Sequence, residues 1–157
     1  MPWIARKKSV LPRVLAIASG GGHWEQLMQI REGFADCDVV FATTIPKLGE
    51  KSGVDAITVP DCNRHEKLKS AWSALYLFWL LVRVRPDVIV TTGALPGFLA
   101  VLIGRWIGAR TLWLDSVANA EELSMAGRLA HRHVNRLLTQ WPNVAEVTGA
   151  EYYGSVL

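Results

Sequence analysis

Short apolar runs alternate along this chain with longer segments in which apolar residues recur at close to helical spacing. Runs of the first kind, rich in branched aliphatic residues, are typical of buried strands, and the longer segments are typical of helices. The predicted strands are residues 14–18, 38–43, 56–59, 87–92, 110–114 and 134–139. The predicted helices are residues 23 to about 33, 68–82, 98–107 and 122–132. Strands that alternate with helices predict an α/β fold with a Rossmann-like parallel sheet. No repeat or linker interrupts the alternation, so we expect one domain over residues 1–157.

The longest helical segment, within about residues 66–84, is unusually apolar. One stripe along it is formed by Leu68, Ala71, Trp72, Leu75, Phe78, Trp79 and Val82. Further leucines make its second half apolar on all sides, and such a helix needs two apolar neighbours. Its uncharged part, residues 70–82, is shorter than the ~20 residues that cross a bilayer. We expect this helix to lie in the membrane interface, where tryptophan and tyrosine between basic flanks are favoured. Burial in the core explains the same residues.

Half of the residues are hydrophobic and the formal net charge is +3, so composition indicates a folded protein of modest basic character. The positive charges form two clusters, which are Arg6, Lys7, Lys8 and Arg13, and Lys67, Lys69, Arg83 and Arg85. Both suit a membrane surface with anionic headgroups, although each alone is equally typical of a solvated face. No basic and aromatic stripe or known motif accompanies them, so nucleic acid is not expected as a partner.

The cysteines and histidines do not form a metal-binding pattern. Cys37 and Cys62 are isolated, which predicts reduced thiols. His131 and His133 form a pair without a third ligand nearby, and we interpret them as a solvated helix end. No metal or other cofactor is expected.

Three polar or glycine-rich loops are predicted at the carboxyl ends of the strands, where open parallel sheets bind ligands. They contain Gly20, Gly21, Gly22 and His23; Gly93, Pro96 and Gly97; and Asp115 and Ser116. Consecutive glycines let the backbone approach a ligand, and the amides of a following helix favour phosphate, so a diphosphate is the natural ligand. A tight turn between strand and helix is the plainer explanation of the first loop.

Two common nucleotide motifs are missing from the chain. The first loop reads G-G-G-H-W-E instead of G-x-G-x-x-G, and no acidic residue ends the second strand, so a nicotinamide or flavin enzyme is excluded. The absence of Gly-Lys-Ser or Gly-Lys-Thr excludes a P-loop kinase or ATPase in the same way.

His23 and Asp115 are the candidate catalytic residues. His23 is predicted in the first turn of a helix, where its imidazole could accept a proton from an attacking hydroxyl or bind a phosphate. The helix N-terminus opposes positive charge and keeps the neutral base available. Asp115 could orient His23 or bind a sugar hydroxyl, and a helix-capping role is equally consistent with its position. Asn63 and Arg64 could bind a phosphate near the membrane, against the alternative of an exposed polar loop.

Five motifs together resemble one protein family in order and spacing. The first four are S-G-G-G-H at residues 19–23, R-P-D-V-I-V-T-T-G-A-L-P-G at 85–97, L-W-L-D-S at 112–116 and E-L-S-M-A-G-R-L at 122–129. The fifth is Q-W at 140–141 together with the closing Y-Y-G-S-V-L at 152–157. The family is the acceptor-side, membrane-anchoring subunit of split UDP-sugar transferases. It includes bacterial exopolysaccharide proteins of the PssD and EpsE type and the eukaryotic subunit that helps add the second N-acetylglucosamine to dolichol-linked oligosaccharide.

The resemblance implies a fold like the N-terminal half of a GT-B glycosyltransferase, similar to that half of MurG. It implies that a partner subunit carries the UDP-sugar while this chain presents a polyprenyl-diphosphate-linked saccharide at the cytoplasmic face of the inner membrane. Carried over to this sequence, Gly20 to Gly22 and His23 would face the diphosphate or the reacting centre. Gly93, Pro96 and Gly97 would shape the acceptor cleft, and the reaction would need no metal. The reaction would belong to exopolysaccharide or lipid-linked oligosaccharide synthesis.

Two departures from the family pattern affect these implications. Many relatives have Glu-Ser where this chain has Asp115-Ser116, which shortens the reach of the carboxylate. Eukaryotic relatives begin with a transmembrane helix that the pattern does not predict here, so we expect peripheral or monotopic attachment through residues 68–82. A non-catalytic scaffold that recruits a glycosyltransferase to the membrane is the main alternative. A free-standing, flavodoxin-like small-molecule-binding domain is the other, although the partly apolar tail at residues 152–157 suits docking to a partner.

Overall fold

The computed structural model describes residues 10–62 and 66–156 and places seven strands and six α-helices there. The strands are β1 (Arg13–Ala18), β2 (Asp38–Thr43), β3 (Ala56–Thr58), β4 (Val88–Thr91), β5 (Arg110–Leu114), β6 (Arg136–Thr139) and β7 (Glu151–Tyr152). The helices are α1 (Gly22–Gln29), α2 (Leu48–Lys51), α3 (Lys67–Val84), α4 (Ala94–Trp106), α5 (Met125–Ala130) and α6 (Pro142–Thr148), with a 3₁₀ turn, η1 (Arg31–Phe34).

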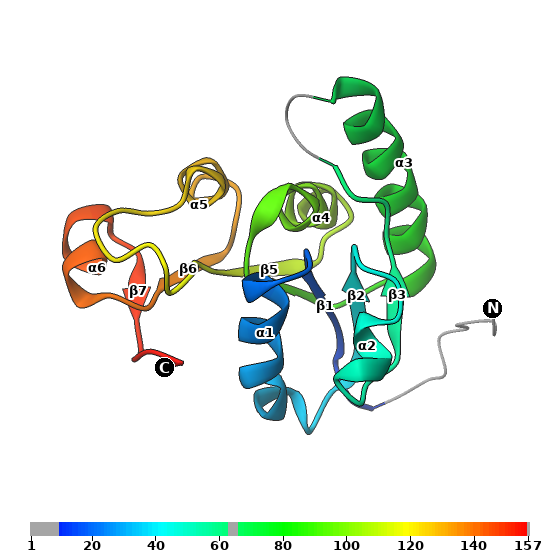
Figure 1. Ribbon diagram of the computed structural model, residues 1–157, viewed down its shortest axis with the longest axis horizontal. Helices are drawn as coiled ribbons and strands as arrows, with labels where there is room; N and C mark the ends of the chain where they lie inside the picture. The colour runs from blue at the N-terminus through cyan, green and yellow to red at the C-terminus, as the bar shows by residue number, and fades with distance from the viewer. Residues whose placement is uncertain (1–9, 63–65, 157) are drawn as a thin grey trace.

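All seven strands pair in parallel in one sheet, in the order β3-β2-β1-β4-β5-β6-β7 (Figure 1). The order runs in one direction from β1 to β3 and in the other from β4 to β7, so it reverses between β1 and β4. The predicted α/β class with a Rossmann-like parallel sheet is therefore confirmed. In such sheets the carboxyl ends of the two strands at the reversal form a natural crevice for a ligand.

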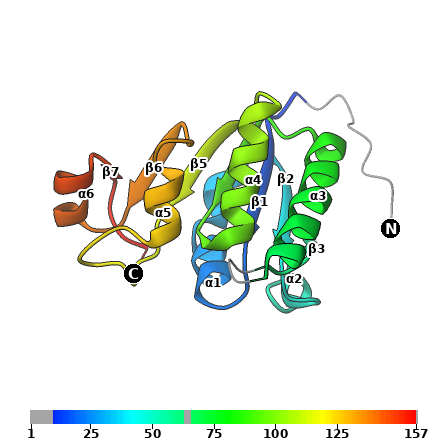
Figure 2. The same ribbon diagram turned by 90° about the horizontal axis from the view of Figure 1, so that it is seen from above.

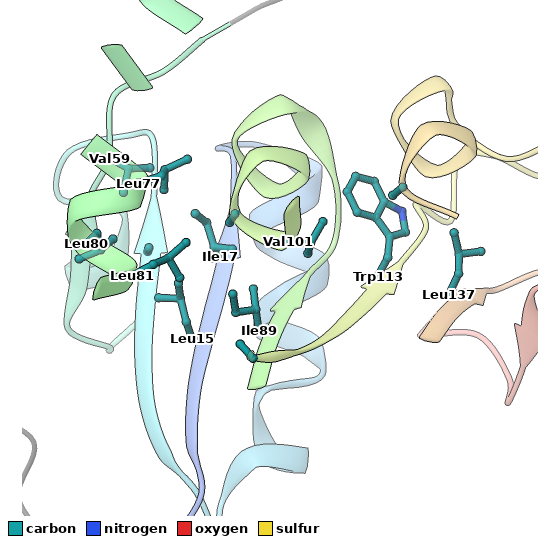
Figure 3. Packing of buried hydrophobic residues seen from close by; sticks show 14 of the residues in the cluster. Leu15, Ile17, Val59, Leu77, Leu80, Leu81, Ile89, Val101, Trp113 and Leu137 are labelled. Atoms are coloured by element: carbon teal, nitrogen blue, oxygen red, sulfur yellow. The ribbon is translucent and has the colours of Figure 1, made fainter. Parts of the chain in front are cut away.

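Helices cover both faces of the sheet. Helices α1 and α2 lie on one face, and α3, α4 and α5 lie on the other (Figures 1 and 2). The larger apolar cluster joins the sheet to α3 and α4 through side chains such as Leu15, Ile17, Leu81 and Val101 (Figure 3). A smaller cluster packs Trp24 and Leu27 of α1 against the opposite face. Burial on both faces explains why β1 is a continuous apolar run without alternation.

Helix α3 turns the predicted apolar stripe away from the core. Its buried side consists of Ser73, Leu77, Leu80, Leu81 and Val84. The stripe is instead exposed, and Leu68 and Trp72 have 89% and 61% of their surface accessible. The core thus supplies one of the two apolar neighbours that this helix needs, and within the described residues its outer face remains exposed. No helix within residues 10–62 and 66–156 has the length and apolar character needed to span a membrane.

The sequence misplaced several element boundaries. The first helix ends at Gln29 and gives way to η1, which carries Phe34. Residues 93–97, expected to be a turn, contain the first turn of α4 instead, because Gly93 is its N-cap and Pro96 lies where a helix needs no amide hydrogen. Helix α6 and strand β7 were not predicted, although Pro at the first position of α6 and Gly149 just after it are ordinary helix boundaries.

Candidate functional site

The loops that follow β1 and β4 lie on the two sides of the strand-order reversal. The first contains the glycines and leads into α1, and the second contains Thr92 and Gly93 and leads into α4. Both open at the carboxyl edge of the sheet, since β1 and β4 are parallel neighbours. The reversal therefore brings together two of the three loops that the sequence predicted at this edge.

The three consecutive glycines have different structural needs. A Cβ atom on Gly20 would collide with the side chain of Ile45. Gly21, the N-cap of α1, has φ 71°, which L-residues rarely adopt. Gly22 has neither constraint, because a Cβ atom there would meet nothing within 4 Å. The turn thus explains two glycines, and the third leaves backbone uncovered at the N-terminus of α1, as a phosphate-facing loop requires.

His23 is fixed to the neighbouring loop by two hydrogen bonds. Its Nδ1 lies 2.8 Å from the carbonyl oxygen of Thr92, and the Thr92 hydroxyl donates to the carbonyl oxygen of His23 at 2.6 Å. A carbonyl oxygen only accepts, so Nδ1 carries the proton of the neutral ring and Nε2 is left as the basic nitrogen. Within the described residues Nε2 has no hydrogen-bond partner. This is the tautomer that a general base needs.

The start of α4 is shaped around the imidazole. A Cβ atom on Gly93 would lie 2.6 Å from Cε1 of His23, and Gly93 has φ 135°. The next residue, Ala94, has φ 65°, a left-handed conformation that costs an L-residue roughly 1–2 kcal/mol. Pro96 and Gly97 are buried, and a Cβ atom on Gly97 would collide with the Thr91 hydroxyl. Gly97 thus lets α4 pack closely onto β4, and a role of Pro96 and Gly97 in shaping an acceptor cleft stays a prediction.

Asp115 follows β5 and is 1% exposed. Its carboxylate accepts hydrogen bonds from Trp113 Nε1 at 3.0 Å, from the Ser124 amide at 2.7 Å, from the Ser124 hydroxyl at 2.6 Å and from Asn119 Nδ2 at 3.4 Å. Ser124 is the N-cap of α5, where its hydroxyl accepts from the Gly127 amide at 2.8 Å. Four donors occupy the two oxygens, and the orienting partner of His23 is the Thr92 carbonyl. The N-cap of α5 is Ser124 and not Asp115, so the geometry favours a structural role in which the Asp115 carboxylate positions that cap.

Two buried glutamines connect Asp115 to the rest of the edge. Gln26 of α1 and Gln140 after β6 both donate to the carbonyl oxygen of Asp115, at 3.3 and 3.0 Å. The Oε1 atom of Gln140 accepts from the Val156 amide at 3.0 Å. The end of the described chain is thereby linked to the helix that carries His23. Sequence reasoning missed Gln26 and assigned no role to Gln140, although Gln140 belongs to a segment of the family resemblance, because an amide side chain carries no pattern that predicts burial.

The remaining predicted site residues have less defined environments. Ser116 is half-buried beside Asp115, and its hydroxyl accepts from the Ala118 amide at 3.3 Å. Asn63 and Arg64, like the basic residues 6–8, lie outside the described residues. Within residues 10–62 and 66–156, no group of three or more His, Cys, Asp or Glu side chains is placed to hold a metal ion.

A protein-family comparison decides the relationship of this chain. The family described as "Oligosaccharide biosynthesis protein Alg14 like" matches residues 58–156, which is more than half of the sequence. The chain belongs to the Alg14-like family. The match includes α3, the loop after β4, Asp115 and the glutamine at position 140, but not the glycine loop or His23.

Two curated relatives carry the same name. The fission yeast (Schizosaccharomyces pombe) protein "UDP-N-acetylglucosamine transferase subunit alg14" is 33% identical over 97 residues, covering 54% of this chain and 45% of the relative. The mouse (Mus musculus) protein "UDP-N-acetylglucosamine transferase subunit ALG14" is 23% identical over an alignment of 168 residues, covering 85% of this chain and 77% of the relative. This Alg14-like chain thus spans less than half the length of the yeast relative.

Solved structures support the fold assignment. MurG of Acinetobacter baumannii superimposes with a TM-score of 0.70 at 14% sequence identity, over 85% of this chain and 43% of MurG. At this identity the likeness establishes the fold alone. The Alg14-like chain has the fold of the N-terminal half of a GT-B glycosyltransferase, as its sequence resemblance implied.

Proposed function

We propose that this Alg14-like chain is the acceptor-side subunit of a two-component UDP-N-acetylglucosamine transferase. In this proposal a separate glycosyltransferase subunit binds the UDP-sugar, and this chain binds a polyprenyl-diphosphate-linked saccharide. Family membership and the names of the yeast and mouse relatives support the donor and the subunit character. The GT-B half-fold supports the division of labour, since a GT-B enzyme needs a second Rossmann-like domain for the nucleotide. Exopolysaccharide and lipid-linked oligosaccharide synthesis both supply acceptors of this chemical class.

The observation that carries the proposal is the Nδ1-protonated imidazole at the strand-order reversal. Nε2 of His23 is the atom that would remove the proton from the acceptor hydroxyl. The hydroxyl oxygen would then bond to C1 of the sugar as the bond from C1 to the UDP oxygen breaks. The Thr92 carbonyl would stabilise the imidazolium that forms, because its oxygen accepts a hydrogen bond from Nδ1–H in both charge states of the ring.

The glycine loop provides a site for the acceptor diphosphate. Gly22 leaves the N-terminus of α1 uncovered, and the amides and dipole of a helix N-terminus favour an anion. His23 follows directly, so a saccharide attached to that diphosphate would lie close to the base. Ser116, which follows β5 at the same edge, would contact the saccharide.

The outer face of α3 is the proposed membrane surface. It exposes Trp72, Leu75, Phe78 and Trp79 in the described structure, and Arg83 lies 5.3 Å from the centre of the Trp79 ring. Exposed aromatic residues between basic flanks are typical of helices that lie in the headgroup region. Helix α3 begins at the carboxyl edge, so the membrane would be close to the acceptor site. We place this attachment at the cytoplasmic face, in a peripheral or monotopic manner.

A reconstitution experiment tests the proposed function. Membranes that contain this chain, with or without a candidate donor-binding glycosyltransferase subunit, are incubated with labelled UDP-N-acetylglucosamine and polyprenyl-diphosphate N-acetylglucosamine. We expect transfer of the label to the lipid only when both chains are present. Transfer by the donor-binding subunit alone at the same rate would remove this chain from acceptor binding.

One observation favours the alternative of a non-catalytic scaffold. The family match begins at residue 58, so it includes the exposed face of α3 and omits His23. A scaffold needs only the membrane-binding and partner-binding surfaces. It predicts that replacement of His23 leaves transfer unchanged as long as both chains reach the membrane.

A further inference from the structure

An open pocket of about 590 Å³ lies at the amino edge of the sheet, opposite the candidate catalytic edge. It is formed where α3 and α4 end and where β4 and β5 begin. Its lining consists of Leu81, Val82, Arg85, Pro86, Asp87, Ile107, Gly108 and Arg110. Helix α3 separates this pocket from the catalytic edge by its full length, about 27 Å at ~1.5 Å per residue. The pocket is therefore a site distinct from the acceptor crevice.

Arg85 lines this pocket, and its backbone has a strained conformation. It is the C-cap of α3 and has φ 50°, in the left-handed region that glycine adopts without strain. Glycine is the usual residue at such a helix end, and the chain keeps an arginine there instead. A strained residue with an exposed cationic side chain in a pocket indicates that the side chain has a use.

A second guanidinium comes from another element. Arg110 begins β5 and also lines the pocket. Among the described residues neither Arg85 nor Arg110 has a side-chain hydrogen bond or ion pair. The acidic residue of the lining, Asp87, is already engaged, because its Oδ2 accepts from the Arg13 amide at 2.8 Å. Two unpaired guanidinium groups beside one engaged carboxylate are suited to a phosphate group.

The pocket is continuous with the exposed apolar surface of α3. Val82 belongs both to the pocket lining and to that surface, with 45% of its area accessible. Ile107 lines the pocket from α4, and Trp106 beside it is 88% exposed. Helices α3 and α4 lie side by side (Figures 1 and 2), and the pocket lies at their C-terminal ends. A ligand that fits this site has an anionic phosphate next to an apolar part.

We propose that this pocket binds the headgroup phosphate of an anionic bilayer phospholipid, which is not the glycosyl acceptor. This inference rests on the proposed membrane contact of α3 and adds a specific lipid to it. Arg85 and Arg110 bind the phosphate, and Val82, Trp106 and Ile107 contact the acyl region. The bound lipid holds the C-terminal end of α3 at the membrane. The helix therefore lies parallel to the membrane surface, and the catalytic edge stays at a constant distance from that surface.

Vesicle flotation of the full chain tests this site. Vesicles of phosphatidylcholine alone are compared with vesicles of phosphatidylcholine and phosphatidylglycerol in a three-to-one ratio. The variant Arg85→Gly with Arg110→Gln removes both guanidinium groups, and Lys51→Gln with Arg132→Gln removes the same charge from exposed positions outside the pocket. We expect the first variant to weaken binding to the anionic vesicles by about 25-fold, at roughly fivefold per cation near the surface. The control pair should change it by less than about twofold, since neither of those residues lines the pocket.

The stability of the first variant provides a check on folding. Arg85→Gly alone relieves the left-handed strain, so its unfolding temperature should equal or exceed that of the unchanged chain while binding to anionic vesicles falls about fivefold. Higher stability with weaker lipid binding is not expected of a residue whose role is structural.

The other outcomes overturn the proposal in distinguishable ways. Equal losses in the pocket variant and the control pair would show general charge attraction without a site. Thermal stabilisation of the unchanged chain by inorganic phosphate alone, absent in the pocket variant, would assign the site to free phosphate. Flotation with both vesicle types to the same extent would remove the lipid site and leave the membrane contact of α3 intact. No flotation with either vesicle type would remove the membrane contact itself.

Discussion

His23, after β1, and Asp115, after β5, both lie at the carboxyl edge of the sheet, and both were candidate catalytic residues. Their surroundings differ in the number of donors that each polar group meets. The carboxylate of Asp115 is 1% exposed and accepts from four donors, so it has no lone pair directed to a substrate. The imidazole of His23 is half-buried, held at Nδ1 and without a partner at Nε2 within the described residues. A polar residue at a ligand-binding edge is a candidate for chemistry only when some of its hydrogen-bonding capacity remains unused.

The largest expected effect comes from removing the imidazole. His23→Ala should lower the rate of sugar transfer about 10²–10⁴-fold, the usual contribution of a positioned general base. The free energy of unfolding should fall by only about 1 kcal/mol, because a single bond to a carbonyl oxygen is lost. Transfer is measured with the partner subunit present, and unfolding is followed by circular dichroism. The matched control is His131→Ala, an exposed histidine at the end of α5. Equal activity of the two variants would support a non-catalytic scaffold and contradict the role of His23 as the general base.

Asp115→Asn should show the reverse pattern. The side-chain amide would direct N–H groups toward donors from Trp113 and Ser124, and the buried network would lose charge-assisted bonds. We expect a loss of about 2–4 kcal/mol in the free energy of unfolding, measured in urea. The transfer rate per folded molecule should stay close to that of the unchanged chain. Ser116→Ala, at the next position, is the control with a small expected change in stability. A large fall in transfer without loss of stability would return Asp115 to the list of catalytic residues.

Much of this architecture could be predicted because apolar periodicity reports burial directly. The runs that became β1, β2 and β5 were identified within one residue, since they are buried on both faces of the sheet or bounded by clear breakers. Boundaries such as the start of α4 were missed, because Gly93 and Pro96 are typical of turns and also fit a helix N-terminus. For α3 the stripe was found, but an apolar sequence does not reveal which side meets the core.

Only the parts of the candidate site whose backbone conformation depends on neighbouring residues could be predicted. The glycines before His23 indicated both the turn and the start of the helix. The partner of His23 is a backbone carbonyl on Thr92, 69 positions away, and every residue has such a carbonyl. Asp115 could not be assigned, because its role depends on Ser124 and on two glutamines that only the folded chain brings together.

The glycine loop offers a finer test of which positions serve the turn and which serve a ligand. Gly21→Ala should cost roughly 1 kcal/mol of stability because φ is 71°. Gly22→Ala should leave stability unchanged or slightly higher, because a Cβ atom there meets nothing within 4 Å in the free protein. If the acceptor diphosphate approaches this backbone, Gly22→Ala should raise KM for the acceptor several-fold at unchanged KM for the UDP-sugar. Unchanged KM for both substrates would leave the loop as a turn alone.

The smallest expected effect concerns Glu151, at the exposed end of the sheet. Its carboxylate contacts exposed side chains, unlike the buried carboxylate of Asp115. Glu151 of β7 pairs with Arg136 of β6, and this hydrogen bond lowers the pKa of Glu151 from its usual 4.5 to about 2. A lowered folded-state pKa means that the contribution to stability is fully present above about pH 4.5 and is lost as the pH falls toward 2. We expect faster amide hydrogen exchange in β7 as the pH is lowered through this window, after correction for the intrinsic rate. Glu151→Gln should remove that pH dependence while exchange in β1 keeps the profile of the unchanged chain.

Because this pair is exposed to solvent, added salt should weaken the effect, whereas the Asp115 network should respond little to salt. A β7 profile that is the same in both chains would show that the strand is held by its backbone pairing with β6 and not by the ion pair.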